Sequence, residues 1–171
     1  ANNKKISYEN LEFSDSYKSY LESNLLIGFS GRSRFSSLKA TKIVEIISNN
    51  EKEELMNCLM QLSDEGVEAM IIEKDVNFHA KLTKKIRDIK MELNGDINDS
   101  FLQNIIVRTE SAGSLCTRFL GAGGGGFFLC WAPKNSHNRI KESVSIKTWL
   151  NVKFSFDGCS VLSSDYPAHV F

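Results

Sequence analysis

Proline is nearly absent from this chain of 171 residues, which contains only Pro133 and Pro167. No proline-rich or low-complexity linker divides the sequence, and no segment repeats, so an array of repeats or of loosely linked modules is excluded. The length suits one domain of ordinary size with its own core.

Excess charge of either sign is also lacking, since 21 Lys and Arg residues balance 21 Asp and Glu residues. Without a basic excess, we expect the chain to bind neither nucleic acid nor a membrane surface. No apolar run approaches the roughly 20 residues of a membrane span, and no charged-then-apolar signal opens the chain. Because the first residue is Ala1 rather than methionine, we expect a processed product or a piece of a longer protein.

Closely spaced cysteines are missing too, because Cys58, Cys116, Cys130 and Cys159 lie far apart. This spacing does not indicate a zinc site. Two of the four lie in apolar, strand-like segments, where a reduced and buried thiol is expected. We therefore expect a reducing compartment and a cytoplasmic location.

Carboxylates at helical spacing are the other possible source of metal ligands, and we interpret them as surface chemistry. They are Asp64, Glu65, Glu68 and Glu73. A basic run on a later helix is interpreted in the same way, as a solvated face. It consists of Lys81, Lys84, Lys85 and Arg87. No metal-binding residue is predicted, and His79, beside an apolar stripe, is expected to be a partly buried structural histidine.

The most unusual segment that is present is the glycine run 121–126, which reads Gly-Ala-Gly-Gly-Gly-Gly. It matches the pattern G-x-G-x-x-G, but a dinucleotide site needs a helix to begin at the glycines. Here the bulky segment 127–131 follows and stops before Pro133, which indicates a strand. The phosphate loop of nucleotide triphosphatases is excluded as well, because Phe127 stands where that loop has lysine.

The sequence therefore predicts a strand over 115–120, a glycine turn and a strand over 127–131. A tight hairpin with positive φ needs only one or two glycines, whereas four in succession favour close approach of the backbone to another group. Both interpretations stay open at this point.

Elsewhere the apolar spacing changes between strand and helix periods. Strands are predicted over 6–13, 25–29 and 150–156, with a polar connection over 15–23 and a short edge strand over 159–163. Helices are predicted over 35–48, 50–70, 77–93, 98–112 and 135–148, with Asn50 and Glu53 as a capping box, Gly66 as an interruption and Asp99 or Asn98 as a cap. Strands at both ends with helices between them indicate an α+β domain whose antiparallel sheet is covered on one face by helices.

Four segments, taken in order, resemble the carboxy-terminal domain of the GHMP small-molecule kinases. They are 25–34 (LLIGFSGRSR), 78–85 (FHAKLTKK), 112–113 with 121–128 (AG and GAGGGGFF) and 152–161 (VKFSFDGCSV). Ala112-Gly113 and the segment from Gly121 to Phe128 are similar to the third motif of the superfamily. The branch that looks most similar acts on D-glycero-D-manno-heptose 7-phosphate and related sugars.

The resemblance implies a ferredoxin-like antiparallel sheet with helices on one face and extra helices. It divides the chain into residues 1–34, opening strands that bridge from a missing amino-terminal domain, and residues 35–171, the carboxy-terminal domain. It also implies phosphoryl transfer from ATP, with Mg²⁺, to a hydroxyl of a sugar or sugar phosphate in the full-length enzyme.

In such kinases the phosphate loop, the catalytic residues and the magnesium ligand belong to the amino-terminal half. Neither Pro133 nor Pro167 begins a loop of that kind. We therefore expect no catalytic residue in this chain, no ATP or Mg²⁺ bound by it alone, no turnover by the isolated chain, and an amino-terminal kinase domain as its partner.

The resemblance also implies that particular residues contact the substrate or the phosphate loop. They are Gly121, Ala122, Gly123, Gly124, Gly125, Gly126, Arg34 and Arg118. The sequence departs from the branch at Cys116-Thr117-Arg118, where the branch has Gly-Gly-Lys, and in the helix 78–85, which lacks its tryptophan. Each arginine could equally be a solvated surface residue.

Two other classes of function stay open. A free-standing binding or regulatory module of the same fold could hold a metabolite at the glycine turn without chemistry. An assembly domain could pair through an exposed sheet edge.

Overall fold

The computed structural model describes residues 10–32, 41, 44, 45, 49, 52–94, 98–121 and 123–155. The elements in chain order are α1 (Asp15–Ser23), β1 (Leu25–Phe29), α3 (Glu53–Ile71), α4 (Val76–Asn94), α5 (Ser100–Ser111), β2 (Cys116–Phe119), β3 (Phe127–Trp131), a 3-10 turn (Lys134–Ser136), α6 (His137–Ser143) and β4 (Trp149–Asn151).

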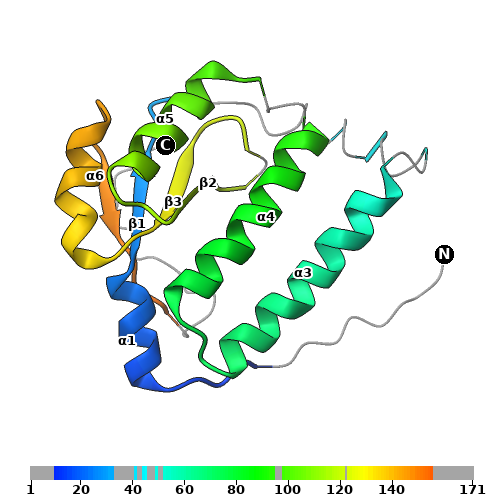
Figure 1. Ribbon diagram of the computed structural model, residues 1–171, viewed down its shortest axis with the longest axis horizontal. Helices are drawn as coiled ribbons and strands as arrows, with labels where there is room; N and C mark the ends of the chain where they lie inside the picture. The colour runs from blue at the N-terminus through cyan, green and yellow to red at the C-terminus, as the bar shows by residue number, and fades with distance from the viewer. Residues whose placement is uncertain are drawn as a thin grey trace, which may run out of the picture.

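The sheet has the strand order β2-β3-β1-β4, and all three pairings are antiparallel. β1 lies in the interior of the sheet, with Ile27 opposite Leu129 of β3 and Leu150 of β4. This is the order of a ferredoxin-like sheet, and the mixed α+β fold predicted from the sequence is confirmed (Figure 1).

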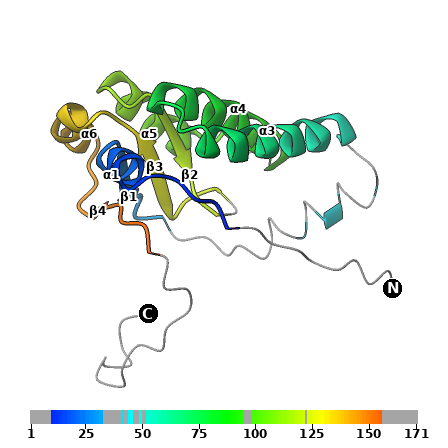
Figure 2. The same cartoon turned by 90° about the horizontal axis from the view of Figure 1, so that it is seen from below.

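The main core lies between the sheet and α5 and α6. Leu26, Phe128 and Cys130 project from β1 and β3 into this core and are completely buried. They meet one side of α5, where the apolar positions recur every three or four residues as an amphipathic helix requires. α4 runs beside β2, and α3 packs against α4 (Figures 1 and 2).

A second cluster lies where α1 and the beginning of α4 meet the opposite face of the sheet. Tyr17 and Leu21, one helical turn apart, pack with Leu25, Ala80 and Trp131. This cluster fixes the beginning of β1 and the end of β3 to the helices.

The predicted polar connection over 15–23 is wrong, because these residues form α1. Ser14 caps the helix by accepting a hydrogen bond from the amide of Tyr17 at 3.1 Å. Tyr17 and Leu21 are buried on one side of α1, and their packing stabilises a helix whose other residues are mostly polar. Residues 10–13 form no strand, and the rest of the strand predicted over 6–13 lies outside the described residues.

The beginning of α3 also differs from the prediction. Lys52 is the N-cap residue, in the left-handed region at φ 57°, and no side chain caps the helix. The capping box predicted with Asn50 at the N-cap is therefore wrong. Gly66 does not interrupt α3, which continues to Ile71. Most of the helix predicted over 35–48 lies outside the described residues.

The prediction was most accurate at α4 and α5. α4 ends at Asn94, where the sequence predicts a stop, and the side chain of Asp99 caps α5 by accepting from the amides of Phe101 and Leu102. The four predicted inward positions of α5 are its buried residues: Leu102, Ile105, Ile106 and Thr109.

The last elements are shorter than predicted. α6 ends at Ser143 rather than near Thr148, and the strand predicted over 150–156 is confined to β4, Trp149–Asn151. β4 pairs only with Leu26 to Gly28, and Leu150 is 46% exposed instead of facing a core. Phe156 and the edge strand predicted over 159–163 lie outside the described residues.

Candidate functional site

The glycine turn joins β2 to β3 and is held against the segment that follows β1. The described glycines of the turn all have positive φ: 63° at Gly121, 76° at Gly123, 82° at Gly124, 150° at Gly125 and 75° at Gly126. L-residues with a side chain rarely adopt such angles. The strand, turn and strand predicted here are confirmed, and Ala122 lies outside the described residues.

Two backbones approach each other closely at this turn. The amide of Gly126 donates to the carbonyl of Arg32 at 2.7 Å, and the amide of Ser30 donates to the carbonyl of Gly126 at 2.9 Å. A Cβ atom on Gly125 would lie 2.7 Å from the carbonyl oxygen of Arg32. The turn is thus both a positive-φ hairpin and a site of close approach, and at Gly125 the approaching group belongs to this chain.

Arg118 lies on β2, just before the turn, and faces a pocket between the turn and α4. Its Nε atom is buried and has no hydrogen-bond partner among the described residues. Lys90 lines the pocket beside Arg118 and Gly124. Burial lowers the pKa of Arg118 from its ordinary value. Arg34, the other predicted arginine, lies outside the described residues.

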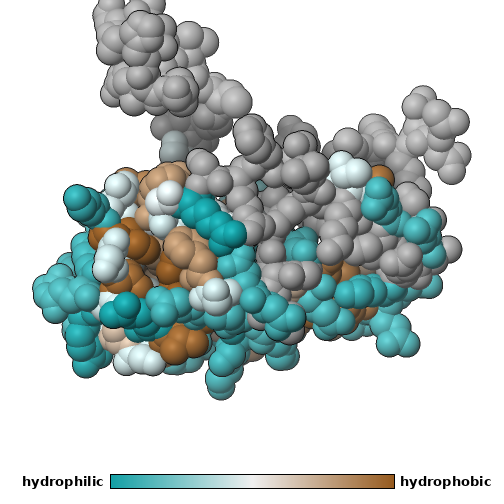
Figure 3. All heavy atoms as spheres, turned by 90° about the horizontal axis from the view of Figure 1, so that it is seen from above, coloured by the Kyte–Doolittle hydropathy of each residue, from teal (hydrophilic) through white to brown (hydrophobic). Residues whose placement is uncertain are grey.

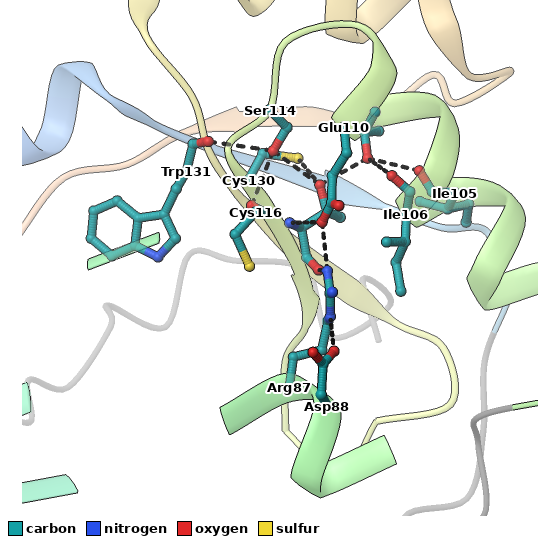
Figure 4. Close-up of polar contacts among 11 residues, drawn as sticks. Arg87, Asp88, Ile105, Ile106, Glu110, Ser114, Cys116, Cys130 and Trp131 are labelled. Atoms are coloured by element: carbon teal, nitrogen blue, oxygen red, sulfur yellow. Dashed lines mark hydrogen bonds and ion pairs between the residues drawn. The ribbon is translucent and has the colours of Figure 1, made fainter. Parts of the chain in front are cut away.

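A polar network that connects α4, α5 and β2 fixes the position of β2 (Figure 4). The guanidinium of Arg87 on α4 forms an ion pair with Glu110 of α5 and donates to the carbonyl of Thr117 on β2 at 3.0 Å. Glu110 in turn accepts from the amide of Thr117 at 3.0 Å. Thr117 and Thr109, both completely buried, share a hydroxyl–hydroxyl bond of 2.8 Å.

The prediction of a solvated basic face is therefore wrong at Arg87, which is 7% exposed. It holds for Lys81, Lys84 and Lys85, which are exposed. The helix-face pattern of α4 could have separated Arg87 from Lys81 and Lys85, because Arg87 and Ala80 lie two turns apart on one side of the helix.

Arg32, within the segment that resembles a kinase motif, is held by ordinary contacts. It forms an ion pair of 2.8 Å with Asp99, and its guanidinium lies 5.1 Å from the ring centroid of Phe101. These contacts hold the segment after β1 against the beginning of α5. The segment that contacts the glycine turn is therefore itself held in place.

His79 is a buried structural residue, as the sequence predicts. Its Nε2 shares a hydrogen bond with the hydroxyl of Tyr17, and that hydroxyl donates its one proton to the carbonyl of Lys74 at 2.7 Å. The imidazole stacks on Trp131 with centroids 5.3 Å apart. Burial lowers the pKa of His79 and raises the pKa of Tyr17 to about 12, so both groups are held in their neutral forms.

Within the described ranges, no group of three or more His, Cys, Asp or Glu residues is arranged to hold a metal ion. The described helices include none that is long and apolar enough to cross a membrane. Figure 3 shows apolar side chains beside hydrophilic ones on one face of the molecule. Among the described residues, Phe127 next to the glycine turn is 43% exposed.

No protein-family model matches the chain, and no curated protein matches its sequence. In its fold, the chain is similar to parts of two kinases of known structure. A mevalonate kinase of L. major in complex with R-mevalonate is similar with a TM-score of 0.59 and 15% identity, over 70% of this chain and 36% of that one. A second mevalonate kinase is similar with a TM-score of 0.61 and 19% identity, over 82% of this chain and 43% of that one.

The chain thus spans less than half the length of either kinase. Mevalonate kinases are GHMP kinases, so the likeness confirms the fold that the sequence resemblance implies. The heptose-phosphate branch and the contact role of the predicted site residues stay predictions.

Proposed function

We propose that this chain is the carboxy-terminal half of an ATP-dependent kinase that transfers a phosphoryl group to a hydroxyl of a sugar or sugar phosphate. The observation that carries the proposal is the glycine turn, held against the segment after β1 within a fold shared with two kinases. The finer choice of a sugar acceptor rests on the sequence resemblance, while one of the similar structures holds R-mevalonate.

In this proposal the turn supports the phosphate loop of an amino-terminal half. Glycines without side chains let a second backbone and the reacting phosphates approach, and Arg118 supplies positive charge beside them. Phosphoryl transfer depends mostly on positioning and charge neutralisation of this kind. Arg34 and Ala122 belong to the same contact surface, and residues 1–34 would bridge to the other half.

The groups that hold Mg²⁺ would come from the amino-terminal half, as the sequence resemblance implies. Mg²⁺ would neutralise charge on the ATP phosphates there. This chain's own part is to shape the opposite wall of the site and to place Arg118.

We place the amino-terminal half at a hollow beside the glycine turn, on the part of the sheet face that α1 and α4 leave uncovered. Ile27, Leu120, Phe127 and Leu150 line this hollow together with glycines of the turn. Phe127 and Leu150 are 43% and 46% exposed. Covering these apolar side chains would contribute to association, since burial of apolar surface is the main driving force of most interfaces.

We also propose a cytoplasmic, reducing location. Cys58, Cys116 and Cys130 are free thiols. Burial raises the pKa of Cys116 to about 12 and that of Cys130 to about 11, so neither forms the thiolate that disulfide exchange requires.

The test compares the isolated chain with the longer protein that the coding region specifies. We expect a glycine- and serine-rich phosphate loop upstream of Ala1, turnover of ATP with a sugar or sugar-phosphate acceptor by the longer protein, and none by the isolated chain. D-glycero-D-manno-heptose 7-phosphate and R-mevalonate serve as alternative acceptors in a coupled assay. Robust turnover by the isolated chain, or an upstream region without a phosphate loop, would contradict the proposal.

A further inference from the structure

Two basic side chains from different elements meet in the pocket between α4 and the glycine turn, a pairing that the sequence did not predict. Lys90 comes from α4 and Arg118 from β2, and both line the pocket beside Gly121 and Gly124. The two residues are 28 positions apart in the chain, so the fold alone brings them together.

Among the described residues, no carboxylate forms an ion pair with Lys90 or Arg118, and the buried Nε of Arg118 finds no acceptor. Arg87, at the same pocket, is by contrast paired with both Glu110 and Asp88. An uncompensated pair of like charges beside a compensated one is typical of a site that receives an anion.

The proximity of Arg118 changes the pKa of Lys90. Burial, followed by the positive charge of Arg118, lowers the pKa of Lys90 from its ordinary value. A bound anion would act in the opposite direction, because it favours the charged form of both side chains.

Backbone donors complete the pocket. The amides of Gly121 and Gly124 have no acceptor within the part of the chain that the structure describes. Gly124 is buried as a residue, whereas Gly121 is exposed. Backbone N–H groups of a glycine-rich turn together with lysine and arginine make up a common type of phosphate site in proteins.

We propose that this pocket binds a phosphate group, held by Lys90, Arg118 and the amide of Gly124. The proposal rests on the proposed function for the source of that group, which would be either ATP or a phosphorylated acceptor. Lys90 thereby becomes a ligand-binding residue beyond those predicted from the sequence, and Arg118 acquires a specific role.

The test measures binding to the 171-residue chain itself, without an activity assay. Inorganic phosphate, ATP without added Mg²⁺ and glucose 6-phosphate are titrated separately into ¹⁵N-labelled protein. We expect saturable shifts of the Gly121 and Gly124 amide signals, with an affinity that falls as salt is added. The tightest of the three probes identifies the source of the phosphate.

The variants are Lys90→Gln and Arg118→Gln, with Lys85→Gln as the matched control. Lys85 is exposed on the same helix and outside the pocket, so its variant makes the same change of charge. We expect Lys90→Gln and Arg118→Gln each to weaken binding by about tenfold or more, which is the loss of one charge-assisted hydrogen bond. Lys85→Gln should change binding by less than about twofold.

Equal weakening by Lys85→Gln, or shifts that do not saturate, would overturn the proposal, since either result means nonspecific attraction. If Arg118→Gln does not fold by circular dichroism, Arg118→Lys replaces it, because it keeps the charge and loses the planar donor geometry. If the pocket binds phosphate but the longer protein has no kinase activity, the proposed function is wrong and the phosphate site is supported. If the longer protein is an active kinase but the pocket binds no phosphate, the phosphate site is wrong and the proposed function is supported.

Discussion

At the scale of single residues, the buried polar groups carry the most specific information in this fold. Arg87 is 7% exposed and Glu110 is one quarter exposed on its side chain, and together they connect α4, α5 and β2. Removing one partner of a buried ion pair leaves the other charge without compensation, which costs more than the pair itself contributes.

We therefore predict that Arg87→Gln lowers the free energy of unfolding by about 3 kcal/mol. Lys85→Gln, two positions away on the same helix but exposed, should change it by less than about 0.5 kcal/mol. Chemical denaturation of both variants, monitored by circular dichroism, measures the difference. Similar small losses in the two variants would show that the network contributes little.

His79 gives a prediction for pH. Its folded pKa lies below its ordinary value because it is buried, so the unfolded chain binds more protons than the folded one at mildly acidic pH. The contribution of neutral His79 to the free energy of unfolding is therefore complete above the unfolded pKa of about 6.5. It is lost as the pH falls below that value.

We predict that the free energy of unfolding is lower at about pH 5.5 than at about pH 7.5, and that His79→Gln reduces this difference. Denaturation curves of wild type and variant at the two pH values test it. An unchanged difference in the variant would mean that other groups cause the pH dependence.

At the scale of elements, the sequence predicted the helices and strands whose sequence signals lie within the element itself. α5 was predicted with Asp99 as one of two candidate caps and with all four of its buried positions, because a capping side chain and a helical stripe can both be recognised within one segment. α1 was missed because its segment is mostly polar, and the packing partners of Tyr17 and Leu21 lie on β1, α4 and β3. β4 was predicted too long because strand length depends on its partner, β1.

In the candidate site, too, local sequence signals were recognised and contacts between distant segments were missed. The glycine turn was predicted because its composition is unusual, whereas Lys90 was missed because nothing near it in sequence distinguishes it from other lysines of α4. Its proximity to Arg118 arises only when α4 packs beside β2.

Two glycines of the turn make a matched comparison. Gly125 and Gly121 both have positive φ, but a Cβ on Gly125 would meet the carbonyl oxygen of Arg32 at 2.7 Å, while one on Gly121 would meet nothing within 4 Å. We predict that Gly121→Ala costs about 1 kcal/mol of stability, from backbone strain alone, and that Gly125→Ala costs about 3 kcal/mol. Thermal and chemical unfolding compare the two, and equal losses would rule out steric contact with Arg32 as a separate cause.

At the scale of the whole molecule, the two faces of the sheet carry side chains with different roles. Side chains on one face stabilise the chain, and exposed side chains on the other would bind a partner. Phe128 and Phe127 are neighbours on β3, yet Phe128 is completely buried beneath α5 while Phe127 is 43% exposed beside the glycine turn. Period-two alternation of the strand places the two rings on opposite faces of the sheet.

We predict that Phe128→Ala lowers the free energy of unfolding of the isolated chain by about 3 to 5 kcal/mol, because it leaves a cavity in the core. Phe127→Ser should cost less than about 1 kcal/mol, since the ring is already partly in water. In the proposed kinase, however, Phe127→Ser removes an apolar contact from the interface with the amino-terminal half. It should therefore weaken association of separately produced halves by about tenfold, which corresponds to roughly 1.4 kcal/mol. Calorimetric titration of the two halves measures this, and unchanged association with Phe127→Ser would place the interface on another face of the molecule.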